Sequence, residues 1–216
     1  MNKNKQKLPL FPLKTVLFPG GSLPLNVFED RYKVLMRECL DTDSRFGIVL
    51  IKEGPEVGEG ASTYKTGTVA LAKEVKYLPD GRILLNAHGE YRFKIIEIMQ
   101  TTPYIEAVVE IDDERDQGDI PNLEIQDFSN AAKEHIKSLL GLKGGWIQDT
   151  VIPKSPFNLS YFLAHLVDAT MPQKQELLEK PSCHQRLQDC VKAIRKEKLD
   201  LIYQTRLQLL KNFSKN

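Results

Sequence analysis

The chain has 216 residues, of which 41% are hydrophobic and 27% are charged, and its formal net charge is +1. This is the balance of an ordinary globular protein, and it lacks the basic excess that is typical of nucleic-acid-binding proteins. The three cysteines include no CxxC pair, and the apolar N-terminal run is broken by prolines. We therefore expect no zinc site, no disulfide framework, no signal peptide and a cytoplasmic location.

The stretch from Leu8 to Tyr32 is apolar but rich in proline, and it holds the pair Gly20-Gly21. Proline fixes φ and removes a donor, so this stretch cannot form a helix. We expect an extended segment that turns at residues 19–21 and leaves along a second short strand. A helix then begins near Glu29, because the residues from Tyr32 to Leu40 place one apolar face at helical spacing.

Short strands dominate the chain as far as Ile111. Residues 46–51 form a continuous apolar run, which predicts a strand buried on both faces. The turn signal at residues 79–82 separates two further strands, and Gly89 predicts a bulge or corner in the second of them. Strands of this length with regular turns indicate a small barrel or sandwich.

An acidic run, residues 113–122, separates this half from a helical one. Beyond it the apolar period changes from two to 3.6, and Ser155-Pro156 and Ser182 are helix-start signals. We predict a β domain over 8–112, a linker over 113–122 and a helical subdomain over 123–213. The fold class is therefore α+β.

No catalytic motif is present. Phosphate-binding, dinucleotide-binding, serine hydrolase and zinc-protease signatures are all missing, and the four histidines are scattered without metal-ligand spacing. We expect no catalytic residue, no metal and no cofactor. Binding is the more plausible task.

Three aromatic residues are candidates for polypeptide binding, since aromatic side chains often anchor partners. They are Trp146, Phe18 and Tyr104. Trp146 stands in a glycine-flanked loop, where it either anchors a partner or closes the helical core. Most rings of the opening stretch must lie in the core, because an exposed apolar patch of that size would aggregate.

A set of motifs with conserved spacing resembles the N-terminal, substrate-binding domain of the ATP-dependent Lon proteases. In chain order they are LPLFPL, LFPGxxLPL, VFExRY, FGIVL, GTVA, LPDGR, GxxRFxI and PYIEAxVE, between Leu8 and Glu110. The segment KQELLEKPSCHQRL is also similar to the helical extension of that family. The resemblance implies a PUA-like six-stranded β-barrel with one helix, followed by an α-helical bundle.

The resemblance also implies a function. In Lon this domain engages substrate polypeptides, while this chain holds neither the ATPase nor the protease domain. We therefore expect a stand-alone, non-catalytic module that binds unfolded or flexible polypeptide segments or a protein partner, as an adaptor or a chaperone-like holder. Weak self-association is left open, no membrane partner is expected, and the alternative is a PUA-like RNA-binding module, which the charge balance disfavours.

Overall fold

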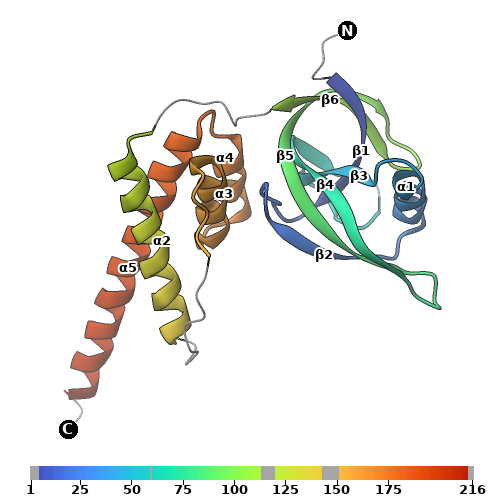
Figure 1. Cartoon of the computed structure of the whole chain (residues 1–216). Helices are drawn as coiled ribbons and strands as arrows, with labels where there is room; N and C mark the ends of the chain where they lie inside the picture. The colour runs from blue at the N-terminus through green and yellow to red at the C-terminus, as the bar shows by residue number, and fades with distance from the viewer. Residues whose placement is uncertain (1–4, 59, 113–119, 143–150, 214–216) are drawn as a thin grey trace. The chain divides into compact units, whose positions relative to one another are not determined.

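The computed structural model describes residues 5–58, 60–112, 120–142 and 151–213 (Figure 1). The chain divides into two compact units. The barrel unit consists of Met1–Asp116 with Thr170–Glu179, and the helical unit consists of Gln117–Ala169 with Lys180–Asn216. The predicted α+β class is confirmed, whereas the predicted linker falls largely on residues 113–119, outside the described part of the chain.

Six strands form the sheet of the barrel unit, in the order β2-β5-β4-β3-β1-β6. They are β1 (Lys5–Leu13), β2 (Ser22–Val27), β3 (Arg45–Glu53), β4 (Ser62–Tyr77), β5 (Ile83–Gln100) and β6 (Ile105–Asp112). All pairings are antiparallel except that of β1 with β3. A further pairing of β5 with β6 brings the sheet round into a nearly closed ring, which confirms the predicted barrel.

The opening stretch folds as predicted. The chain turns after β1, where Gly20 has a φ of +77° and the Gly21 N–H donates to the Phe18 carbonyl oxygen at 2.9 Å. Glycine adopts this left-handed conformation without the strain of a side chain. After β2 the chain enters helix α1 (Asp30–Leu40), with Asp30 in the first turn, where a negative charge complements the helix dipole.

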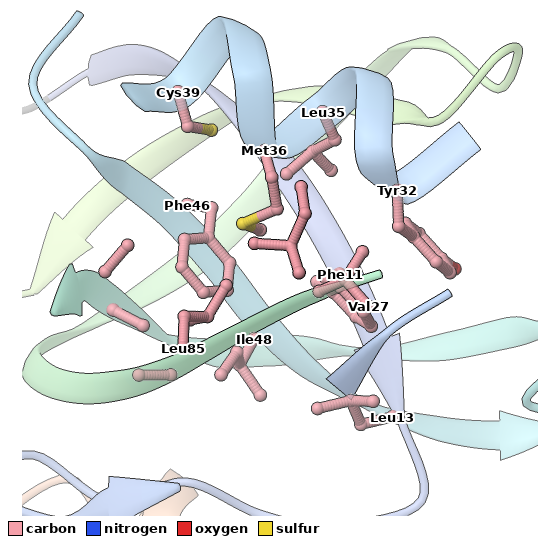
Figure 2. Close-up of a cluster of buried hydrophobic side chains, with 14 of the residues drawn as sticks. Phe11, Leu13, Val27, Tyr32, Leu35, Met36, Cys39, Phe46, Ile48 and Leu85 are labelled. Carbon is pink, nitrogen blue, oxygen red and sulfur yellow. The ribbon is translucent and has the colours of Figure 1, made fainter. Parts of the chain in front are cut away.

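Helix α1 packs its predicted apolar face onto the sheet. Figure 2 shows Tyr32, Leu35, Met36 and Cys39 pointing toward strand residues such as Phe46. The predicted strand at residues 46–51 is buried throughout, because Phe46 and Ile48 face this cluster and Val49 belongs to a second one.

The second cluster fills the barrel around Phe93, which is fully buried. Two glycines leave room for its ring. A Cβ on Gly47 would lie 2.8 Å from Phe93 Cζ, and a Cβ on Gly67 would lie 2.6 Å from the same atom and against the Ile48 carbonyl oxygen. The closeness of β3, β4 and β5 at this level therefore requires glycine at both positions.

Helix α4 (Met171–Glu179) packs with the barrel, although in sequence it lies between two segments of the helical unit. The Arg92 guanidinium, on a side chain that is 6% exposed, donates to the Leu178 carbonyl oxygen at 2.7 Å and to Asp112 Oδ2 at 2.5 Å. Gln175 Nε2 donates to the Thr66 carbonyl oxygen at 2.9 Å. The bonds to Leu178 and from Gln175 hold α4 on β5 and β4, and the bond to Asp112 joins β5 to β6.

The helical unit contains α2 (Asn122–Leu142), α3 (Pro156–Leu166) and α5 (Cys183–Phe213). Both predicted start signals are confirmed: Ser155 is the N-cap of α3, and Ser182 Oγ accepts the Gln185 N–H at 3.1 Å. Arg186 of α5 is fully buried and donates to Ser160 Oγ of α3 at 2.8 Å. In the described part of the chain no helix is long and apolar enough to cross a membrane.

Replacing Gly67 with alanine is expected to lower the free energy of unfolding by about 1–3 kcal/mol, because the new methyl group meets backbone that cannot move aside cheaply. Gly47→Ala is the matched variant, since its nearest neighbours are the ends of the Leu10, Phe93 and Leu8 side chains. Urea denaturation should show the larger loss for Gly67→Ala. Wild-type stability of that variant would contradict the packing described.

Replacing Arg92 with methionine is expected to destabilise the barrel unit by about 2–4 kcal/mol, because it leaves the buried Leu178 carbonyl oxygen without this donor and the partly exposed Asp112 carboxylate without this partner. Hydrogen exchange should rise first in α4. Arg82→Met is the control: Arg82 pairs with Asp80 at 2.7 Å, but both side chains are about half exposed, so the loss should be much smaller than that of Arg92→Met. Equal losses in the two variants would contradict the role given to Arg92.

Candidate functional site

The structure places two of the three predicted binding residues inside the barrel unit. Phe18 is 1% exposed and Tyr104 is 7% exposed. Tyr104 belongs to the cluster beneath α1, of which Phe18 is not a member, so the two rings form no common surface. Trp146 lies outside the described residues. Polypeptide binding by these three residues stays a prediction.

The hydroxyl of Tyr104 donates a hydrogen bond to the Glu38 carboxylate of α1. Burial raises the pKa of Tyr104 well above its usual range, and the bond to Glu38 raises it further. The phenol thus stays neutral and links α1 to the start of β6, which is a structural task.

An open apolar pocket lies where β2 leads into α1, with a volume of about 260 Å³. We call it the β2–α1 pocket. Strands β1 and β2, the first turn of α1 and the loop between β3 and β4 all contribute to it, through Phe11, Leu13, Leu25, Asn26, Val27, Phe28, Glu29, Tyr32, Glu56 and Val57. Its volume is below the 300–1,000 Å³ of typical small-molecule sites, so it suits one or two side chains better than a cofactor.

Aromatic rings form one wall of the pocket. The rings of Phe11 and Tyr32 stack with centroids 4.0 Å apart, and the Arg31 guanidinium lies 4.3 Å from the Tyr32 centroid. Burial raises the pKa of Tyr32, so this wall remains uncharged. At the rim, Phe28 is 50% exposed and Val57 is 55% exposed. The pocket therefore presents apolar surface to solvent.

Two carboxylates hold the β3–β4 loop against the pocket. Glu29 accepts the Gly58 N–H at 3.2 Å and Arg31 Nε at 3.1 Å, and Glu56 accepts the Lys14 N–H at 3.0 Å. These bonds position Val57, which lies between the two loop residues that they involve. Glu29 thus serves both the start of α1 and the loop.

Nothing in this arrangement points to bond-making chemistry. Among the residues that the structure describes, no group of three metal-ligating side chains lies together. The pocket is lined by aliphatic, aromatic and carboxylate side chains and by one amide, Asn26, with no histidine, cysteine, serine or lysine. Such a lining suits the binding of an apolar side chain.

The sequence predicts that the aromatic rings of the opening stretch lie mainly in the core. That holds for Phe11 and Phe18, whereas Phe28 is half exposed. Its position, directly after a strand and before the acidic start of a helix, is the signal that could have separated it from the others. Val57 had no such signal in its glycine-rich loop.

A second apolar depression, of about 420 Å³, lies on the helical unit. Phe128 of α2 and Val191 and Leu199 of α5 line it, with Lys192, Arg195 and Lys196 around them. Arg195 binds both oxygens of the Asp127 carboxylate, at 2.7 and 2.8 Å, and so joins α5 to α2. Arg195 therefore has a structural role between these two helices.

The chain matches known proteins along most of its length. Residues 7–196 match the family model of the ATP-dependent protease La (LON) substrate-binding domain. Lon protease of Anaeromyxobacter dehalogenans is 29% identical over 177 residues, which are 80% of this chain and 21% of that protein. Lon protease 2 of Myxococcus xanthus is 29% identical over 180 residues, or 81% and 22% of the two chains. The chain spans about a fifth of the length of these curated relatives.

Solved structures agree with the barrel and helices described above. A Lon N-terminal domain protein from Xanthomonas campestris superposes with a TM-score of 0.66 at 25% identity, covering 85% of this chain and 96% of that one. The N-terminal domain of a Mycobacterium avium complex Lon protease shares the fold, with a TM-score of 0.62 at 18% identity, over 88% and 98% of the two chains. Because the family model covers far more than half of its residues, the chain belongs to the Lon substrate-binding domain family.

Proposed function

We propose that this protein binds extended polypeptide segments that expose apolar side chains, and that the β2–α1 pocket receives one of those side chains. The observation that carries the proposal is the pair Phe28 and Val57, two half-exposed apolar residues that frame a pocket with an aromatic wall. Large apolar side chains grouped on a surface are typical of interaction sites.

The pocket is suited to an unstructured client. It is open to solvent, and its mainly apolar lining favours the burial of apolar side chains over any specific hydrogen bond. Arg31 pairs with Glu29 at 3.0 Å, so the negative charge beside the pocket comes from Glu56, and it favours segments that carry lysine or arginine near the apolar residue.

Family membership supports the same function, since the family is described as a substrate-binding domain. We propose that the protein performs recognition without catalysis, as an adaptor or a chaperone-like holder in protein quality control. Its clients would then be proteins that have lost part of their native structure.

Replacing Phe28 and Val57 with serine is expected to weaken binding of an unfolded model protein roughly ten-fold or more, because the apolar area buried on binding is lost. Fluorescence anisotropy with labelled, reduced and carboxymethylated lactalbumin measures this. Stability should change little, since both side chains are half exposed.

Tyr77→Ser is the matched control, because Tyr77 is 65% exposed at the end of β4 and does not line the pocket. It should bind the client as the wild type does. If Tyr77→Ser weakens binding equally, binding depends on general surface hydrophobicity, and the role proposed for the pocket is wrong. If no unfolded protein binds the wild type at all, the proposed function is wrong.

A further inference from the structure

Strand β2 lies at an open edge of the sheet. It pairs with β5 on one side, and among the described residues no strand pairs with its other side. Figure 1 shows β2 as the blue strand beside β5. An edge of this kind presents backbone N–H and C=O groups that another extended chain can use.

The register shows which residues of β2 face outward. The Gly89 N–H donates to the Gly21 carbonyl oxygen at 2.9 Å, so the odd-numbered positions of β2 exchange hydrogen bonds with β5. Pro24 is consistent with this pattern. It has no N–H to donate, and it stands opposite Asn86 at an even-numbered position, where β2 and β5 exchange no hydrogen bonds. Ser22, Pro24 and Asn26 therefore direct their backbone groups away from β5, and all three residues are exposed.

This edge continues directly into the β2–α1 pocket. Leu25, Asn26 and Val27 line the pocket, and the side chains of Leu25 and Val27 lie on the inner face of the strand. Successive side chains of a strand alternate between faces, and cross-strand neighbours share a face. An extended chain laid beside Asn26 at the ladder spacing of about 4.8 Å would place alternate side chains at the pocket.

We propose that a client polypeptide adds as a further strand to the free edge of β2, exchanging backbone hydrogen bonds with Asn26 while an adjacent apolar side chain enters the β2–α1 pocket. This inference rests on the proposed function and specifies how the client is held. Main-chain bonds supply affinity that is independent of sequence, and the pocket supplies the preference for an apolar residue.

Pro24 sets a limit on the pairing. It accepts a hydrogen bond through its carbonyl oxygen but donates none, so the added strand gains its full set of bonds only around Asn26. Prolines on free edges are a known defence against the pairing of identical chains, because each copy brings the same gap. A short segment of another protein is therefore a better occupant than a second copy of β2.

Three variants of the full chain separate backbone from side-chain effects. Asn26→Pro removes the outward N–H and is expected to weaken binding of a labelled peptide that alternates valine with lysine roughly five-fold. Asn26→Ala keeps the N–H and should bind as the wild type does. Pro24→Ala adds a donor and should strengthen binding by a similar factor.

N-methylation of the peptide, one amide at a time, gives a test that needs no change in the protein. Strand addition predicts that alternate amides are sensitive, since only every second N–H faces β2. If the peptide binds, Phe28→Ser weakens it, and no amide is sensitive, then the proposed function stands and strand addition is wrong. If the peptide does not bind the wild type, the proposed function itself is wrong, and strand addition fails with it. The wild type could instead form a dimer that Asn26→Pro abolishes and that the peptide does not disrupt. That result would assign the edge to a second copy of the chain and overturn the inference.

Discussion

The packing of Phe93 between two glycines is the constraint on which the barrel unit depends. Its ring occupies the space that a Cβ on Gly47 or Gly67 would need, so a side chain at either position would displace it. The neighbouring residue, Arg92, faces the opposite way and holds α4 by its guanidinium. One short stretch of β5 thus organises both the interior of the barrel and its outer cover.

The same strand explains where the open surface lies. β5 is long enough to pair with β2, β4 and β6, which brings the ring round and, in the described part of the chain, leaves β2 with a strand partner on one side only. The chain then turns into α1 beside that edge, and Glu29 ties the β3–β4 loop to the turn. The β2–α1 pocket and the free edge of β2 therefore both follow from the way in which β5 closes the barrel.

Much of this was accessible from sequence because local signals agreed with the fold. The prolines and glycines of the opening stretch, the helical spacing from Tyr32 onward and the corner at Gly89 each predicted their element, and the ladder between β4 and β5 shifts register at Gly89. The exposure of Phe28 was not predicted, because the apolar pattern alone does not separate a half-buried phenylalanine from a buried one, and only its place between β2 and the acidic start of α1 sets it apart. The grouping of α4 with the barrel was also missed, since it depends on a bond between residues 92 and 178, which no periodicity reports.

That bond has a consequence for synthesis. The strands of the barrel leave the ribosome well before α4, so during translation the barrel must form while the Arg92 guanidinium still lacks the Leu178 carbonyl oxygen. Domains generally fold as units in order of synthesis, but here the first unit is completed only by a segment made after most of the second. Until α4 is made, the Arg92 guanidinium lacks both this acceptor and the cover that α4 gives it, and the last helix before α5 supplies both.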